Sequence, residues 1–255
     1  MKNEIIQIKK KIVEASYKSR EGHIPSSFSV LDLIYCLFKG RYIFSKNKYL
    51  NNFVLSKGHG CLAFYAMLFY YKKISKKVFL SFCSKNSILG GHPDMNKSRY
   101  ISASTGSLGH GLPIISGMAF ADHLNNLKKK YYVILGDQEC LEGTTWESMF
   151  IINKFGLNNL TIIIDRNFSR NEAIPLGNLK KKLSGFSKNI QSINGHNHIQ
   201  IYNALSKPNK SSFPKVIIAK TIKGNGSKIF QHNSWHHRFP KSYQELNNLY
   251  QSIKN

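Results

Sequence analysis

Two polar residues that follow apolar runs carry the clearest chemistry in this sequence. Asp137 comes shortly after the run at 131–135, and Asn167 comes shortly after the run at 160–164. Both runs are apolar and rich in β-branched or aromatic residues, which is typical of buried parallel strands. Because the carboxyl ends of parallel strands meet at one edge of a sheet, we expect Asp137 and Asn167 to lie together there.

A carboxylate and an amide oxygen at one place suggest a metal ion. Completed by a backbone carbonyl, water and two phosphate oxygens, they form the octahedral oxygen shell that Mg²⁺ requires. The pair therefore predicts a Mg²⁺ ion that bridges the chain to a diphosphate. Between them, Thr144 and Glu147 have the spacing of a capping box, which predicts that a helix begins at Thr144.

The elements that must position these residues alternate along the chain. Hydrophobic periodicity predicts helices over 3–20, 29–38, 62–71, 110–124, 144–154 and 242–253, and strands at 131–135, 160–164 and 216–219. Without a repeat or a low-complexity linker, this predicts one doubly wound α/β domain over residues 1–255, with a mainly parallel sheet flanked by helices. The segment 166–192 is the least regular and is expected to be a long functional loop.

The composition excludes several classes of protein. Hydrophobic residues make up 42% of the 255 residues, which is too many for a disordered chain, yet no apolar run is long enough to span a membrane. The N-terminal residues have scattered charges and no secretory pattern, so a cytoplasmic location is expected. The four cysteines lack metal-site spacing and are expected to be reduced thiols: Cys36, Cys61, Cys83 and Cys140.

The chain is strongly basic, with 37 Lys and Arg against 13 Asp and Glu and a formal net charge of +24. Such a charge can mark a nucleic-acid-binding protein. Here the lysine runs at 9–11, 128–130 and 180–182 are short and dispersed, and no nucleic-acid-binding motif accompanies them. The pattern favours a solvated surface over nucleic-acid binding, and it leaves an acidic protein partner open.

Several motifs together resemble the thiamine diphosphate enzymes, and among them the N-terminal half of transketolase. The signature of that family, Gly-Asp-Gly followed by Asn after an apolar strand, corresponds to 136–138 and Asn167. The resemblance runs almost end to end, through GHIPSS at 22–27, LSKGHG at 55–60, GGHPD at 90–94, STGSLGHGL at 104–112, GDQECLEGTTWES at 136–148, LNNLTIIIDRN at 157–167, and KTIKGNGS with SWHH at 220–227 and 234–237.

The resemblance implies a role for each matched residue. The implied Mg²⁺ ligands are Asp137, Asn167 and the carbonyl of Ser169. The implied contacts to thiamine diphosphate are Asp137, Asn167, His59 and the amides of Gly106, Ser107, Leu108 and Gln138. The implied residues near the reacting substrate are His23, His92 and one of His236 and His237, together with Glu142, which matches a glutamate that contacts the partner domain.

Plainer interpretations and departures stand beside this resemblance. Taken without it, His59 fits a turn as well as a ligand contact, and the glycines around Gly106 fit a tight turn before a helix. Gln138 replaces the usual third glycine and adds a side chain beside the diphosphate, which puts cofactor affinity in question. Glu172 and Ala173 stand near the place of the usual Asp-Gly.

The resemblance also implies a two-chain enzyme. Transketolases continue into a pyrimidine-binding domain and a C-terminal domain, and nothing in this sequence resembles either. We therefore expect the thiamine diphosphate-binding subunit of a split transketolase, which transfers a two-carbon ketol unit from a ketose to an aldose in an α2β2 assembly. Three alternatives remain: an E1 α-type subunit of a 2-oxoacid dehydrogenase, deoxyxylulose-phosphate synthase, and a non-catalytic scaffold subunit, the last favoured by Gln138.

Overall fold

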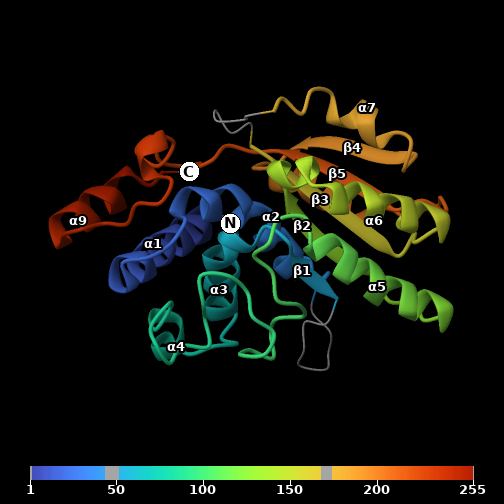
Figure 1. Ribbon diagram of the computed structural model, residues 1–255. Coiled ribbons are helices and arrows are strands. Elements are labelled where there is room, and N and C mark those ends of the chain that lie inside the picture. Colours follow the sequence, from blue (N-terminus) through green and yellow to red (C-terminus); the bar gives the residue numbers. More distant parts are fainter. Residues whose placement is uncertain (1, 44–51, 168–173, 255) are drawn as a thin grey trace.

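The chain folds on one parallel sheet of five strands, and the computed structural model describes residues 2–43, 52–167 and 174–254. The strands are β1 (Phe53–Leu55), β2 (Tyr131–Gly136), β3 (Leu160–Arg166), β4 (Asn189–Asn194) and β5 (Lys215–Lys220). Their order across the sheet is β1-β2-β3-β5-β4, and every neighbouring pair is parallel. Helices cover both faces, as Figure 1 shows. The predicted doubly wound α/β fold is therefore confirmed.

Alternate side chains of the central strands point to opposite faces, and this period of two divides the core. Tyr132 and Ile134 of β2 face one cluster of buried residues, whereas Val133 and Leu135 face the other. A strand buried on both sides needs apolar residues at every position, which explains why these runs are continuous.

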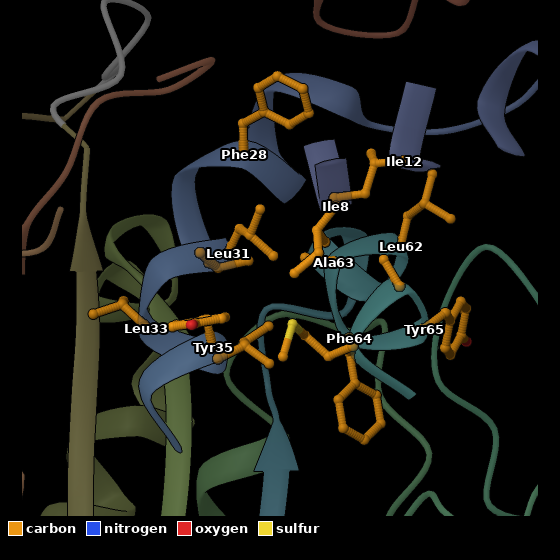
Figure 2. Close-up of a cluster of buried hydrophobic side chains, with 14 of the residues drawn as sticks. Ile8, Ile12, Phe28, Leu31, Leu33, Tyr35, Leu62, Ala63, Phe64 and Tyr65 are labelled. Atoms are coloured by element: carbon orange, nitrogen blue, oxygen red, sulfur yellow. The ribbon is translucent and has the colours of Figure 1, made fainter. Parts of the chain in front are cut away.

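The larger cluster lies between the sheet and five helices. These are α1 (Lys2–Ser19), α2 (Ile24–Lys39), α3 (Cys61–Tyr70), α8 (His198–Ser206) and α9 (Tyr243–Ser252). Helix α2 is its centre, since every residue from Ile24 to Phe38 is buried. Figure 2 shows its Phe28 and Leu31 among side chains of α1 and α3. The short helix α4 (Lys76–Leu80) adds Phe79 to the same cluster.

The second cluster lies on the other face, under α5 (Gly111–Leu124), α6 (Gly143–Lys154) and α7 (Leu179–Leu183). Buried Leu112 and Ile115 of α5, and Met149 and Ile152 of α6, pack against alternate residues of β2 and β3. Helix α5 precedes β2, and α6 follows it after the 3₁₀ helix Asp137–Leu141. The loop before α5 and the start of α6 meet near the carboxyl end of β2.

The expected elements differ from the observed ones in a few places. The segment 166–192 is not one long loop, because it contains α7 and most of β4, although residues 168–173 lie outside the described residues. The capping box is also wrong: α6 begins at Gly143, and the Thr144 hydroxyl donates to the carbonyl of Gly109 at 3.3 Å instead. All four cysteines are free thiols, as expected. Among the described residues, no helix is long and apolar enough to cross a membrane.

Candidate active site

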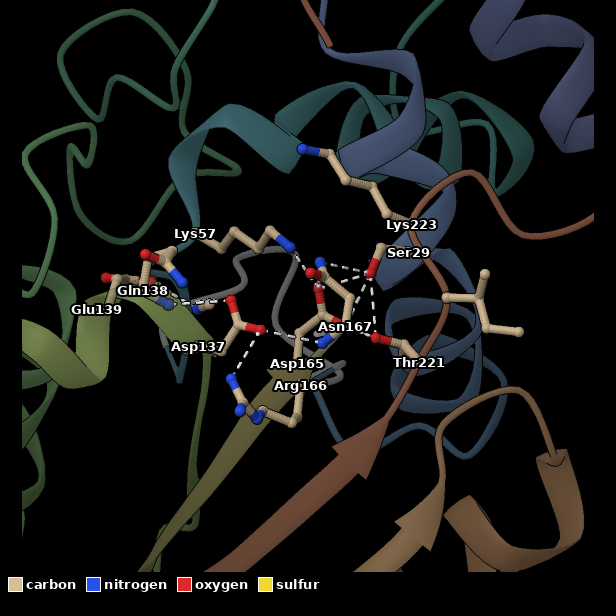
Figure 3. A network of polar contacts seen from close by, with 12 residues as sticks. Ser29, Lys57, Asp137, Gln138, Glu139, Asp165, Arg166, Asn167, Thr221 and Lys223 are labelled. Atoms are coloured by element: carbon tan, nitrogen blue, oxygen red, sulfur yellow. Dashed lines mark hydrogen bonds and ion pairs between the residues drawn. The ribbon is translucent and has the colours of Figure 1, made fainter. Parts of the chain in front are cut away.

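Asp137 and Asn167 meet at the carboxyl edge of the sheet, as the sequence predicts. The pairing of Gly136 with Asp165 places the ends of β2 and β3 side by side. There the Asn167 backbone N–H donates to Oδ2 of Asp137 at 3.2 Å, and Nη1 of Arg166 lies 3.4 Å from the same oxygen. Figure 3 shows the Asp137 carboxylate between these groups. The predicted shared edge is therefore confirmed.

Behind this edge lies a buried ion pair between Lys57 and Asp165. Their side chains are 3% and 0% exposed, and Nζ of Lys57 donates to Oδ2 of Asp165. The Ser29 hydroxyl lies 2.9 and 2.8 Å from the two Asp165 oxygens, and the Thr221 hydroxyl also donates to Asp165. The side-chain amide of Asn167 donates to Ser29 Oγ at 3.2 Å. The network thus orients Asn167 from inside the protein (Figure 3).

A second buried carboxylate, Glu139, ties the loop before α5 to the end of β2. It accepts hydrogen bonds from the backbone N–H of Gly136 at 2.7 Å, from the N–H of Gly109 at 3.0 Å, and from the Ser56 hydroxyl. Burial raises the pKa of Glu139 above its ordinary value, against the effect of these hydrogen bonds. Gly109 has a φ of +79°, and a Cβ there would lie 2.5 Å from Oγ1 of Thr144. The close approach of this loop to the start of α6 therefore requires glycine at position 109.

Four of the predicted histidines form one group beside this edge. The ring centroid of His23 lies 5.4 Å from that of His59, 5.8 Å from that of His236 and 4.5 Å from that of His237. His23 sits at the start of α2, whereas His236 and His237 follow the short 3₁₀ helix Asn233–Trp235. The sequence left the choice between His236 and His237 open, and the structure places both against His23.

His92 lies near this group, packed against two glycines. A Cβ built on Gly58 would lie 3.0 Å from Cδ2 of His92, and one on Gly106 would lie 3.3 Å from its Cγ. Because these two residues have no side chain, the imidazole lies directly against the backbone of both. Ser107 and Leu108 continue this loop toward α5. The predicted cofactor contacts of this loop therefore lie near the predicted histidines.

The electrostatics of the group keep His23 and His59 neutral at pH 7. Burial and the neighbouring His237, His236 and His92 lower the pKa of His23 to about 4. Burial, with Lys57 nearby, holds the pKa of His59 well below its ordinary value. Both imidazoles are then able to accept a proton or a hydrogen bond.

Lys223 adds a cation with a lowered pKa to this side of the site. Its ammonium hydrogen-bonds to Nδ1 of His236, and burial with repulsion from Lys57 lowers the pKa of Lys223 to about 8. The His236 pKa is lowered as well, by burial and then by Lys223. A positive potential at a strand edge favours a phosphate-bearing ligand.

The low pKa of His23 is testable. We expect its ring resonances in an NMR titration to change with a midpoint near pH 4, well below the ordinary histidine value of about 6.5. The substitution His237→Asn removes a neighbouring charge that opposes protonation, so it should move this midpoint upward. A His23 midpoint near 6.5 in the unsubstituted protein would contradict the burial that the structure gives this ring.

Two buried polar atoms of the site have no hydrogen-bond partner among the described residues. They are Nδ1 of His23 and Nε2 of Gln138. Buried polar groups are normally satisfied, so such atoms mark places where a ligand or water binds. The Gln138 backbone N–H, in contrast, donates to Oδ1 of its neighbour Asp137 at 3.0 Å.

Of the other predicted site residues, Glu142 occupies the N-cap position of α6 without a side-chain capping bond and is half-buried beside Gly109. Ser169 lies outside the described residues, so its predicted role as a metal ligand stays a prediction. Sequence reasoning gave no role to Lys57, Asp165, Glu139 or Ser29. Each lies within or next to a motif that carries the resemblance, which was the available signal.

Comparison with known proteins decides the family. The family model described as the thiamine diphosphate-binding domain of transketolase matches residues 2–253. The chain belongs to this transketolase family. This confirms the resemblance that the motifs indicated, with its fold and its enzyme class, a ketol-transferring transferase of the split, subunit type.

Relatives of matching length are single subunits of larger enzymes. One of the subunits of apulose-4-phosphate transketolase from Phocaeicola vulgatus is 32% identical over 249 residues, covering 92% of this chain and 88% of the relative. The 6-deoxy-6-sulfo-D-fructose transketolase subunit SqwG from Clostridium sp. (strain MSTE9) is 32% identical over 241 residues, covering 89% and 88%.

In longer relatives, the region similar to this chain is only one part of the protein. The crystal structure of transketolase from Campylobacter jejuni superposes with a TM-score of 0.85 at 24% identity, covering 100% of this chain and 44% of that one. Human transketolase is 29% identical over 256 residues, covering 95% of this chain and 41% of the relative. The chain therefore spans less than half the length of these transketolases.

Proposed function

We propose that this chain binds thiamine diphosphate through Mg²⁺ at the carboxyl edge of its sheet and, with a companion subunit, transfers a two-carbon ketol unit between sugars. The observation that carries the proposal is the meeting of Asp137 and Asn167 at adjacent strand ends, next to the grouped histidines. An oxygen-donating pair of this kind suits Mg²⁺, and neutral imidazoles suit proton transfer to a sugar.

The residues present fit the cofactor. Asp137 and Asn167 would hold Mg²⁺, and the loop at 106–108 with His59 would hold the diphosphate and the ring system. The unpartnered Nε2 of Gln138 would donate to a phosphate oxygen, so the extra side chain would add a donor beside the diphosphate. Lys57 is not available to bind the diphosphate, because its ammonium is buried against Asp165. It would instead keep Asn167 in place through the Asp165–Ser29 network.

When bound, thiamine diphosphate supplies the electron sink that permits cleavage of a ketose between C2 and C3. The chain's own histidines would then handle protons. Neutral His23 would accept the proton of a substrate hydroxyl, since its Nδ1 is unpartnered. His92, His236 and His237 would donate hydrogen bonds to other sugar oxygens. Glu142 would face the companion subunit from the start of α6.

Replacing His23 or His92 by Ala is expected to lower kcat far more than cofactor affinity. The proposed partners of these rings are substrate oxygens whose charge changes during bond cleavage, and a general base typically contributes about 10²–10⁴-fold. Steady-state kinetics and a separate cofactor titration on the two-chain enzyme distinguish the effects. A variant that needs only more thiamine diphosphate would assign its histidine to cofactor binding.

The companion subunit would bind over α5 and α6. Phe150 and Ile151 of α6 are 65% and 50% exposed, and Ile114 of α5 is 41% exposed. A hollow of about 330 Å³ is lined by residues of both helices, including Pro113 and Phe120 of α5. Large exposed apolar residues beside a hollow are typical of a protein interface. The start of α6, with Glu142, borders the same region.

The decisive experiment is a glycolaldehyde-transfer assay on the purified chain with and without its companion. We expect activity only with both chains, because the companion would supply the pyrimidine-binding domain. Phe150→Glu should weaken association and activity together, since it places a charge in the interface. The matched control is Ile199→Glu, which changes an equally exposed residue of α8 on the other face of the sheet. Full activity of the isolated chain would contradict the proposal.

The same experiment separates a catalytic subunit from a scaffold. A scaffold would associate with the companion yet leave its activity independent of Asp137.

The names of the two subunit relatives specify apulose 4-phosphate and 6-deoxy-6-sulfo-D-fructose, so we propose a sugar or sugar phosphate as substrate. The α2β2 assembly, the single domain over 1–255, the absence of nucleic-acid binding and the cytoplasmic location stay predictions.

A further inference from the structure

A second polar pocket lies at the opposite edge of the sheet from the candidate active site. Its volume is about 430 Å³, and residues just before β2, β3 and β5 line it together with the C-terminal ends of α5 and α8. The strand starts meet there because Tyr131 pairs with Leu160 and Thr161 pairs with Lys215. Since β3 spans seven residues, the two edges are roughly 20 Å apart.

The lining of this pocket is cationic. It contains no Asp or Glu and the following lysines: Lys128, Lys129, Lys130, Lys207 and Lys215. One of them is partly neutralised, because Oδ2 of Asp122 lies 4.0 Å from Nζ of Lys129. That carboxylate also accepts a hydrogen bond from the Tyr131 hydroxyl at 2.7 Å. Among the described residues, no ion pair involves the side chains of Lys128, Lys130 or Lys207.

Lys215 shows that the pocket is built around a positive charge. Its side chain is buried, and its ammonium donates to three backbone carbonyls at the end of α8, those of Ala204 at 3.0 Å, Leu205 at 2.9 Å and Lys207. Burial, with Lys130 and Lys207 nearby, lowers the pKa of Lys215 to about 8. These carbonyls already solvate the Lys215 ammonium, so the charges open to an anion are those of the exposed lysines around it, Lys128, Lys130 and Lys207.

Asn159 provides an independent indication of a ligand. It lines the pocket, and its side-chain N–H donates to the carbonyl of Ala119 at 3.0 Å. Its side-chain oxygen is buried with no hydrogen-bond partner within 2–43, 52–167 and 174–254. This oxygen is an acceptor, so a hydroxyl group of the ligand would satisfy it and a phosphate oxygen would not.

We propose that this pocket is a second binding site, for a small anion that carries two or more phosphate groups. Several lysines converge on a volume that suits a small molecule, and ammonium groups bind phosphate as point charges. The site is separate from the Mg²⁺ site, since its lysines belong to the other edge of the sheet and its lining has no metal-binding carboxylate. A ligand here would act at a distance from the reacting atoms.

The test uses inorganic tripolyphosphate as the probe, in titration calorimetry on the full chain. EDTA removes divalent cations, so the Mg²⁺ site does not contribute, and about 0.15 M salt screens exposed charges beyond about 8 Å. We expect one binding site whose affinity falls by about tenfold or more in the double variant Lys130→Gln/Lys207→Gln. The matched control is Lys76→Gln/Lys77→Gln on α4, which removes the same charge elsewhere and should bind as the parent does.

Three results would overturn the proposal. Equal weakening in both double variants would mean that the probe responds only to the net charge of +24. Binding that the pocket variant does not weaken, or no binding by the parent chain, would exclude the site. Thermal unfolding of both variants confirms that they are folded, since Lys130 and Lys207 are exposed and their substitution disturbs no core contact.

Discussion

Asp137→Ala is expected to abolish Mg²⁺-dependent binding of thiamine diphosphate while leaving the chain folded. Asp137 is the only carboxylate proposed to ligate the metal, and changes to groups that merely support metal ligands already cost about 10–100-fold in affinity. Its loss should therefore weaken binding by more than about a hundredfold. Asn167→Ala, which removes the second proposed ligand from the end of β3, should act in the same direction.

Calorimetric titration with thiamine diphosphate, in the presence of the companion subunit and with or without Mg²⁺, measures this loss. Asp122→Ala is the matched control, because it removes a carboxylate that bonds the Tyr131 hydroxyl away from the site. Thermal unfolding is measured on both variants, because Asp137 is buried beside the buried Arg166 and its loss should also lower the stability of the protein. Parent-like binding by Asp137→Ala would exclude the proposed metal site.

Asp165→Ala is expected to destabilise the protein by about 3–5 kcal/mol, the usual cost of leaving one partner of a buried ion pair unpaired. The variant leaves the Lys57 ammonium buried, and it also removes the acceptor of the Ser29 and Thr221 hydroxyls. Urea unfolding followed by circular dichroism gives the free energy of unfolding. Replacing both charges, in Asp165→Ala/Lys57→Met, should recover part of the loss because no charge remains buried.

An exposed ion pair provides the comparison. Nζ of Lys11 lies 2.6 Å from Glu14 on the surface of α1, where these side chains are 41% and 20% exposed. Glu14→Ala should cost less than about 1 kcal/mol, because water solvates the remaining charge. If Asp165→Ala were no more destabilising than Glu14→Ala, the buried pair would not organise the site as described.

The sequence predicted those strands whose residues are apolar at every position. The runs in β2 and β3 are apolar at every position because both of their faces are covered, and such runs are visible without any contact information. β4 has the sequence NIQSIN and is largely half-exposed, so it lacks that signal. β1 has only three residues, too few to show a pattern. Helices α7 and α8 were also missed, because they lie inside or near a segment without regular periodicity.

The site was predictable where topology alone brings residues together. Parallel strands end at one edge, so the proximity of Asp137 and Asn167 followed from two strand assignments. The pairing of Lys57 with Asp165 depends on contacts across 108 positions, and that of Ser29 with Asp165 on contacts across 136. No periodicity reports such pairings, so the network behind the proposed metal site became visible only in the structure.

The two outer strands of the sheet affect how readily the unassembled chain aggregates. An unpaired strand edge invites other chains to add to it, which leads to aggregation. Here one edge is the three-residue β1, and the other is β4, whose Asn189, Gln191 and Asn194 give little reason for an apolar strand to dock. Addition of a further strand is thus disfavoured at both edges of the sheet. Before it binds a companion subunit, the chain should therefore resist self-association through the edges of its sheet.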